Sequence, residues 1–254
     1  MKTASGLLVK PVFPLTWDAQ PVPPEIQQRI QPPASSPDHQ LGSGFFTNML
    51  LSSPLIRILH VIRDIVYYSI AVQTKPETFH RADNHFFRVL NCEAEHQLLS
   101  YIYPENQDTT STSSPPTIDI HPLEAVTRVA AIGFLNNFLI VSPPSSGLGR
   151  ALTSHIVAAV NNCELSLLLT MPKENFGLYA WAMFVGAQGS AGRPERPWFV
   201  ERLARVAMIC EWQSWDQVSR IMSDYFYRPA LHGVEWRSVW DEAIAGYVVS
   251  ADES

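Results

Sequence analysis

The sequence contains few cysteines and no surplus of positive charge. Its 3 cysteines, Cys92, Cys163 and Cys210, are far apart and form no C-x-x-C pair. This excludes a disulfide scaffold, and it excludes a zinc knuckle or thioredoxin-like motif built from neighbouring residues. An odd number of dispersed thiols is also more typical of a reducing compartment than of a secreted protein. With 18 basic residues against 24 acidic ones, the formal net charge of −6 argues against a surface built to neutralise nucleic-acid phosphates.

Long apolar runs and strand patterns are missing as well. The longest apolar stretch, residues 129–141, is interrupted by Asn136 and Asn137 and is shorter than the roughly 20 residues that a membrane span needs. The short apolar patch at residues 7–9 is soon followed by Lys10 and Pro11, so we expect no signal peptide. Alternating apolar and polar residues with hairpin dipeptides do not occur. The hydrophobic residues, 46% of the chain, are enough for a substantial core. Because a membrane span and strand patterns are both missing, we expect a soluble all-α protein.

Proline is concentrated at the N-terminus. Residues 1–40 hold eight of the 20 prolines. Because proline fixes φ and lacks a backbone donor, the sequence predicts an extended arm over residues 1–42 with at most one short helix, at 25–30, started by Pro24. The sequence leaves open whether this arm is free or docked. Its apolar residues available as anchors are Leu7, Leu8, Val12, Phe13, Leu15 and Trp17.

From residue 43 onward the apolar residues have helical spacing. In residues 55–66 they occur at 55, 58, 59, 62, 65 and 66, which is the i, i+3, i+4 pattern of one buried face. Residues 123–141 are nearly all apolar and predict the central buried helix, and Ser145 or Ser146 is suited to cap the helix that follows. The other helices are predicted at 81–101, 148–162, 176–187, 195–211, 215–227 and 234–247.

These helices predict the fold and its boundaries. The fold class is all-α, an irregular bundle of antiparallel helix pairs with a Pro-rich N-terminal arm. Residues 43–254 are expected to form one helical domain. Within it, residues 104–117 are rich in Thr and Ser and end in two prolines, so we predict a disordered polar loop there.

A search for metal ligands gives only a weak match. Cys92 and His96 have the i, i+4 spacing that places two side chains on one helix face, with Glu95 between them. His80 and His85 are five residues apart and do not share a face. Two ligands at a suitable spacing often occur by chance, so a half-buried thiol and surface histidines are the better interpretation. We predict no metal site.

The sequence also contains no complete motif for cofactor binding or catalysis. Gly147 and Gly149 resemble the start of a dinucleotide fingerprint, but the third glycine position is Leu152 and a helix, not a strand, is predicted before it. The adjacent carboxylates Asp241 and Glu242 point in different directions on a helix and indicate solvated charges. The sequence therefore predicts no catalytic, cofactor-binding or metal-binding residues, no cofactor and no enzymatic activity.

Tryptophan and arginine are concentrated in the C-terminal third. Six of the 7 tryptophans fall after residue 180 and are interleaved with arginines, a combination that could stack on nucleic-acid bases. Nearby Asp and Glu residues cancel this charge, and Trp236 and Trp240 have the i, i+4 spacing of core residues. Helix packing with ion-paired faces is the better interpretation. The preference for arginine over lysine suits partly buried, carboxylate-paired positions.

A series of segments in this third resembles a known family. The series is 178–187 (LYAWAMFVGA), 193–203 (RPERPWFVERL), 214–227 (SWDQVSRIMSDYFY) and 239–242 (VWDE). Their order is similar to the C-terminal end of the fungal-specific transcription factor domain that follows zinc binuclear cluster modules. Residues 123–135 (LEAVTRVAAIGFL) and 143–148 (PPSSGL) resemble that family's central helix and the loop after it. The resemblance covers roughly residues 45–250.

The resemblance implies a regulatory helical domain of a nuclear transcription factor. The family's DNA-binding cluster needs six closely spaced cysteines, and residues 1–91 contain none. We therefore expect no direct nucleic-acid binding and no membrane association. The expected partners are proteins of the transcription machinery, a homologous subunit or a small-molecule effector. In this interpretation Trp181, Phe184, Trp215, Trp236 and Trp240 fill the core, Gly186 allows close approach or a turn, and Pro194 begins a helix.

Two alternatives from other classes remain. One is an all-α small-molecule-binding protein or enzyme with a pocket between the helices, for which a pocket lined by converging polar groups would be evidence. The other is a helical scaffold with a filled core and no ligand.

Overall fold

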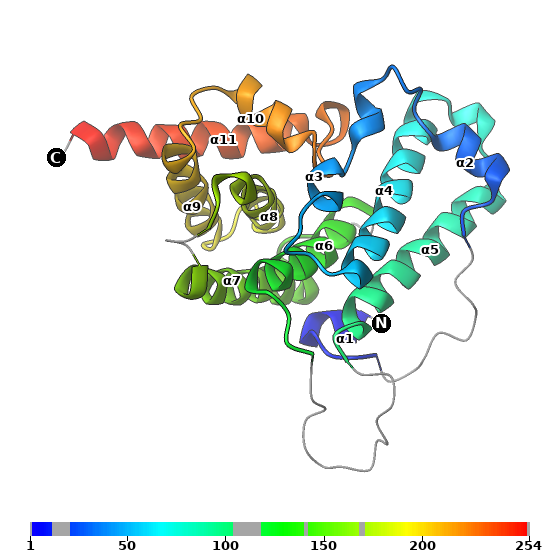
Figure 1. Cartoon of the computed structure of the whole chain (residues 1–254), viewed down its shortest axis with the longest axis horizontal. Helices are drawn as coiled ribbons and strands as arrows, with labels where there is room; N and C mark the ends of the chain where they lie inside the picture. The colour runs from blue at the N-terminus through cyan, green and yellow to red at the C-terminus, as the bar shows by residue number, and fades with distance from the viewer. Residues whose placement is uncertain (1, 12–20, 104–117, 140–141, 168–170, 253–254) are drawn as a thin grey trace, which may run out of the picture.

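The computed structural model describes residues 2–11, 21–103, 118–139, 142–167 and 171–252 (Figure 1). Within these ranges the structure contains eleven α-helices, three 3₁₀ helices and no strand, so the predicted all-α class is confirmed. The α-helices are α1 (Lys2–Leu7), α2 (Pro24–Ile30), α3 (Ser43–Phe46), α4 (Ser53–Thr74), α5 (Arg81–Ser100), α6 (Pro122–Leu139), α7 (Gly147–Leu167), α8 (Phe176–Gly189), α9 (Arg196–Ile209), α10 (Trp215–Met222) and α11 (Pro229–Asp252). The 3₁₀ helices are η1 (Pro37–Gln40), η2 (Pro76–Thr78) and η3 (Lys173–Asn175). The predicted polar loop at 104–117 lies outside the described residues.

The helices are arranged around α6 and α8 (Figure 1). Helix α6 contacts α4, α5, α7 and α8. Helix α8 also contacts α7, α9, α10 and α11. Helices α4 and α5 lie together on one side of the molecule, and α9, α10 and α11 on the other. None of the helices in the described ranges combines the length and the apolar character that crossing a lipid bilayer requires.

The core is built from α6, α8 and the aromatic residues of the C-terminal third. Helix α6 is buried from Val126 to Asn136, as predicted, and α8 is buried around its whole circumference from Phe176 to Ala187. The predicted core residues Trp181, Phe184, Trp236 and Trp240 are all buried, and Trp215 is half-buried. The rings of Phe184 and Trp236 are stacked with their centroids 4.8 Å apart, which joins α8 to α11.

Local signals account for most helix boundaries. The Gly149 backbone N–H donates to the Ser146 hydroxyl at 3.0 Å, so the predicted cap of α7 is confirmed. Helix α9 begins at Arg196 and has Pro197 in its first turn, so the prediction that Pro194 begins this helix is wrong. Pro194 lies in the turn between α8 and α9.

Helix α10 is shorter than predicted. It ends at Met222, whereas the sequence indicated a helix to residue 227. Beyond this point the backbone tightens: the Asp224 N–H bonds the Ile221 carbonyl and the Tyr225 N–H bonds the Met222 carbonyl. The Asp224 carbonyl accepts a hydrogen bond from the Gly44 N–H at 2.8 Å, outside the helix. Tyr225 therefore lies in the connection between α10 and α11.

The N-terminal arm contains two α-helices, one more than predicted. Helix α2 coincides with the predicted helix and packs on α4, but α1 has no counterpart in the prediction. Helix α1 packs on α5 and α7, with the Ser5 hydroxyl donating to Glu95 and His155 Nε2 lying 3.0 Å from the Gly6 carbonyl oxygen. Of the predicted anchors, Leu8 packs on the core and Leu7 is 64% exposed. The others, Val12, Phe13, Leu15 and Trp17, lie outside the described residues.

Candidate functional site

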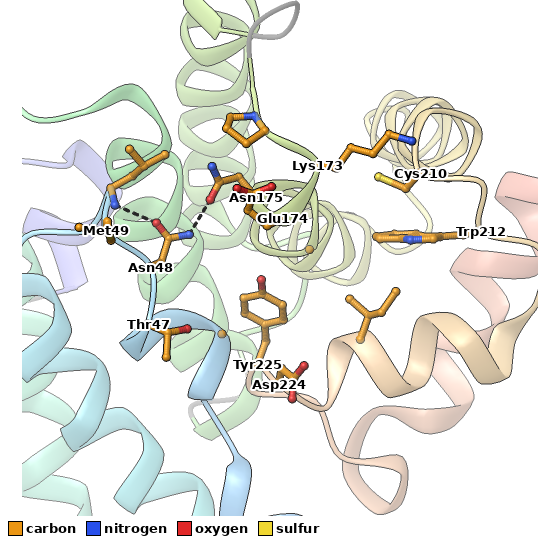
Figure 2. Close-up of a pocket in the computed structure, with 15 residues that line it drawn as sticks. Thr47, Asn48, Met49, Lys173, Glu174, Asn175, Cys210, Trp212, Asp224 and Tyr225 are labelled. Atoms are coloured by element: carbon orange, nitrogen blue, oxygen red, sulfur yellow. Dashed lines mark hydrogen bonds between the residues drawn. The ribbon is translucent and has the colours of Figure 1, made fainter.

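A cavity of about 750 Å³ opens between α3, η3 and the connection that carries Tyr225 (Figure 2). We call it the Tyr225 pocket. Its lining includes the side chains of Tyr225, Asn48, Asn175 and Trp212, and Met49 lies at its rim with 97% of its surface exposed. Because Asn48 is more than 120 positions away from the other three residues in the sequence, the pocket exists only in the folded chain.

Two glycines lie close against the Tyr225 ring. A Cβ on Gly44 would lie 2.8 Å from the Tyr225 Cζ, and a Cβ on Gly177 would lie 2.8 Å from the Tyr225 hydroxyl oxygen. Both distances are far below van der Waals contact, so only glycine leaves room for the ring at these positions. The slot fixes the ring so that its hydroxyl points into the pocket, toward the side where Asn48 and Asn175 lie (Figure 2).

The Tyr225 hydroxyl is a hydrogen-bond donor available to a ligand. The residue is 4% exposed, and no described residue forms a hydrogen bond with its oxygen. Burial, together with the nearby Asp224 carboxylate, raises the pKa of Tyr225 well above its ordinary value. The phenol is therefore neutral and keeps its proton at any physiological pH.

Two asparagines form an oriented amide pair in the pocket wall. The Leu50 backbone N–H donates to Asn48 Oδ1 at 2.9 Å, and Asn48 Nδ2 donates to Asn175 Oδ1 at 2.9 Å. A backbone N–H can only donate, so the orientation of both amides follows from the first bond. The carbonyl oxygens of both side chains are thus engaged, and the amide group of Asn175 that remains is its Nδ2 donor.

Charges at the rim are mainly acidic. Glu174 and Asp224 line the pocket, and its one lysine, Lys173, lies 3.6 Å from the Glu211 carboxylate. Burial raises the pKa of Cys210, with Lys173 partly offsetting the effect, so this thiol is not an activated nucleophile. The phenol and the thiol are therefore neutral groups of the pocket wall.

The residues considered above as metal ligands or as parts of a cofactor or catalytic motif make contacts that stabilise the fold. Within the described ranges, no three His, Cys, Asp or Glu side chains lie close enough together to share a metal ion. Cys92 is half-buried on α5, and His96 Nδ1 lies 3.4 Å from the Ser100 hydroxyl. Gly149 allows a close approach, because a Cβ there would lie 2.8 Å from the Pro143 carbonyl oxygen. Asp241 and Glu242 are in separate ion pairs, with Arg237 and Arg196.

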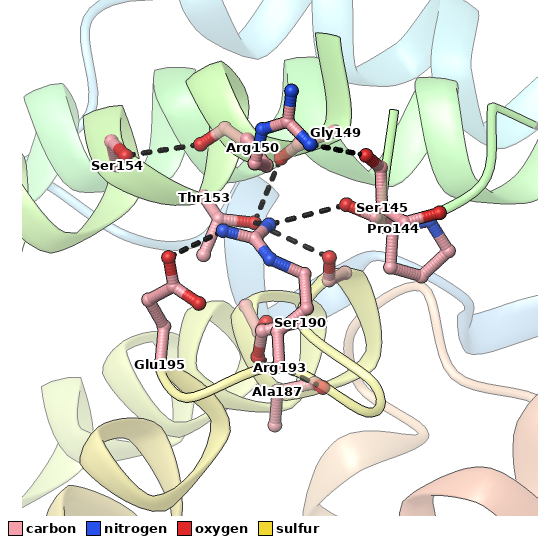
Figure 3. Close-up of polar contacts among 12 residues, drawn as sticks. Pro144, Ser145, Gly149, Arg150, Thr153, Ser154, Ala187, Ser190, Arg193 and Glu195 are labelled. Atoms are coloured by element: carbon pink, nitrogen blue, oxygen red, sulfur yellow. Dashed lines mark hydrogen bonds and ion pairs between the residues drawn. The ribbon is translucent and has the colours of Figure 1, made fainter. Parts of the chain in front are cut away.

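Arg193 forms a polar junction near the start of α7 (Figure 3). Its side chain is 9% exposed and forms an ion pair with Glu195. Nη1 donates to the Pro144 carbonyl at 3.2 Å and to the Thr153 hydroxyl at 3.4 Å, and that hydroxyl in turn donates to the Gly149 carbonyl at 2.9 Å. The arginine thereby joins the turn after α8 to α7, which is a structural use of the arginine-rich segment.

Sequence reasoning did not identify the residues of the Tyr225 pocket. Tyr225 lay within a predicted helix, and Asn48, Asn175, Gly44 and Gly177 carry no local motif. Comparison of the chain with protein-family models, with curated proteins and with solved structures finds no match.

Proposed function

We propose that this chain is a regulatory helical domain that acts in the nucleus, through contacts with other proteins and by sensing a small-molecule effector in the Tyr225 pocket. The ordered segments that resemble the fungal-specific transcription factor domain support the first part. Several of their residues, Trp181, Phe184 and Phe199 among them, are fully enclosed in the core, as residues conserved for packing would be expected to be.

The observation that carries the effector proposal is the composition of the pocket. Asn48 follows α3, Asn175 ends η3 and Tyr225 precedes α11, so one bound molecule would contact three segments that are distant in the chain. A ligand that prefers one arrangement of these segments shifts the population toward it. This is the minimum that an effector site requires.

Charge pairing supports the absence of nucleic-acid binding. Six arginines of the C-terminal third are in ion pairs with carboxylates: Arg193, Arg196, Arg202, Arg205, Arg228 and Arg237. Their charge is therefore largely neutralised within the domain, and little remains to release counterions from a nucleic-acid backbone.

The test uses the full chain fused to an unrelated DNA-binding module, with a reporter gene as readout. We expect the fusion to change transcription from the reporter, and the unfused chain, tagged with a fluorescent protein, to accumulate in the nucleus. We expect a gel-shift assay of the unfused chain to give no sequence-specific duplex binding. Specific binding that persists at 150–200 mM salt, on the order of the physiological range, contradicts the proposal.

The alternative is a small-molecule-binding protein or enzyme unrelated to transcription. The Tyr225 pocket, which has converging polar groups, favours this alternative over a scaffold with a filled core. Ligand binding by a chain that leaves the reporter unchanged would support it.

A further inference from the structure

We infer that the molecule bound in the Tyr225 pocket is an uncharged organic compound with a carbonyl or amide oxygen, and that this oxygen accepts a hydrogen bond from the Tyr225 hydroxyl. The inference rests on the proposed role of the pocket as a ligand site. It adds the chemical class of the ligand, which follows from the donors, the charges and the shape of the pocket.

The side chains of Tyr225, Asn48 and Asn175 offer mainly donors, whereas the acceptors of the pocket are the exposed carboxylates of Glu174 and Asp224. The Tyr225 phenol is enclosed and keeps its proton, and no described residue forms a hydrogen bond with it. The amide pair of Asn48 and Asn175 has both carbonyl oxygens occupied, which leaves N–H groups. A ligand with an acceptor oxygen takes up this donor, whereas a purely apolar molecule that covers it leaves it without a partner, at a cost in free energy.

The charges exclude an anionic acceptor. The carboxylates of Glu174 and Asp224 line the pocket, and the ammonium group of its one lysine, Lys173, lies 3.6 Å from the Glu211 carboxylate. A carboxylate or phosphate entering the pocket would meet this negative surplus. The acceptor oxygen is therefore expected on a neutral group.

The remaining surface accommodates an apolar body. Leu50, Pro172, Trp212 and Ile221 line the pocket, and Met49 projects from its rim. The volume of about 750 Å³ falls in the range of sites for small organic molecules. An aromatic or aliphatic body with one neutral acceptor group matches these walls.

The two glycines beside Tyr225 restrict where its hydroxyl donor can lie. Because Gly44 and Gly177 both lie close against the ring, the position of its hydroxyl is restricted before a ligand binds. A donor fixed before binding loses little conformational entropy when the ligand arrives.

The experiment compares three probes of similar size on the ¹⁵N-labelled full chain by NMR: acetanilide, which is neutral with an amide oxygen, benzoate and benzylammonium. A probe of about ten non-hydrogen atoms is expected to bind in the millimolar range. We expect acetanilide to shift the side-chain NH₂ signals of Asn48 and Asn175, and benzoate to leave them unchanged. Benzoate or benzylammonium binding at these amides as tightly as acetanilide overturns the inference, as does the absence of any acetanilide-induced shift.

Variants assign the hydrogen bond to Tyr225. Tyr225→Phe keeps the ring in its slot and removes the hydroxyl, and we expect it to weaken acetanilide binding on the order of fivefold. Tyr103→Phe makes the same change outside this pocket and should have no effect. Equal affinity in wild type and Tyr225→Phe overturns the assignment.

A second variant covers the case in which Tyr225→Phe does not fold. Asn175→Asp keeps an acceptor for Asn48 Nδ2 but replaces the outward N–H donor by a negative charge. It should weaken acetanilide and strengthen benzylammonium, whereas unchanged preferences contradict the inference. The reporter assay distinguishes the two proposals: binding of acetanilide without any transcriptional effect retains the ligand class and rejects the regulatory function.

Discussion

A Cβ atom on Gly177 would lie 2.8 Å from the hydroxyl oxygen of Tyr225. The two residues are 48 positions apart, and the glycine on α8 determines where the phenol can lie. Gly44 imposes a similar limit, since a Cβ there would lie 2.8 Å from the Tyr225 Cζ. The position of the most important polar group in the pocket is thus determined by two residues that have no side chain.

The first prediction concerns this slot. Gly177→Ala forces the Tyr225 ring out of its position, and we expect overpacking to lower the free energy of unfolding by about 1–3 kcal/mol. Gly246→Ala is the matched control, because it lies on α11 with no atom within 4 Å of a new Cβ, and should raise the stability by up to about 1 kcal/mol. Urea unfolding of the three proteins measures both changes. Equal effects of the two substitutions would show that the slot is not tight.

The second prediction concerns the contact between α8 and α9. A Cβ on Gly186 would lie 2.2 Å from Phe199 Cε1, so Gly186→Ala should cost about 3 kcal/mol, the upper end of the range for overpacking. Phe199→Leu shortens the neighbouring side chain, and the double variant should recover part of the loss. A double-mutant cycle from urea unfolding gives the coupling. Strict additivity of the two substitutions would contradict the close contact.

The third prediction uses the junction at Arg193. Arg193→Lys keeps the charge but cannot reach Glu195, Pro144 and Thr153 at once, so we expect a loss of about 1–3 kcal/mol in the free energy of unfolding. Arg237→Lys makes the same replacement in an exposed ion pair and should change stability by no more than about 0.5 kcal/mol. The measurement is the urea midpoint at constant slope. A similar small change in both variants would mean that the enclosed junction does not stabilise the fold.

The fourth prediction concerns pH. His232 is 1% exposed, and burial, with a contribution from the Arg228 charge, lowers its pKa from 6.5 to about 4. The folded protein holds this imidazole neutral, while the unfolded chain takes up a proton below pH 6.5, so stability falls as the pH drops from 6.5 toward 4. This one group should cost about 2 kcal/mol between pH 6.5 and pH 5.

The control for this pH effect is His232→Asn, which removes the titrating ring and keeps an acceptor for the Arg228 backbone N–H that bonds His232 Nδ1 at 3.1 Å. The free energies of unfolding of wild type and variant, measured at pH 7 and pH 5, should converge as the pH falls. Parallel curves would show that the imidazole takes up its proton over the same pH range in the folded protein as in the unfolded chain, which contradicts the lowered pKa.

The helical spacing of apolar residues predicted the long helices well. In α4 the six residues of the predicted face, from Leu55 to Val66, are all buried, because burial of one face is what the i, i+3, i+4 pattern describes. Gly186 was predicted to allow close approach or a turn, and the Phe199 contact confirms the close approach. Such features depend on neighbours along the chain or on one adjacent helix.

The features that sequence reasoning missed depend on distant partners. Helix α1 has six residues, too few to be stable alone, and it is held by contacts with Glu95 and His155. The end of α10 follows from the bond between the Gly44 N–H and the Asp224 carbonyl, which no local propensity encodes. Tyr225 reaches the pocket only because α10 ends early.

Asp38 joins the N-terminal arm to the connection between α10 and α11. Its carboxylate lies 2.7 Å from Arg228 Nε, its carbonyl accepts from Arg228 Nη2 at 3.2 Å, and the Tyr67 hydroxyl donates to the same carbonyl at 2.9 Å. The Arg228 side chain is only 5% exposed. A shortened chain that began at α3 would keep the long helices and the walls of the Tyr225 pocket, but it would have a buried guanidinium without its carboxylate. Asp38, which precedes α3, therefore serves as the counterion of Arg228. Removing the residues before α3 would leave the Arg228 charge unpaired three residues from Tyr225.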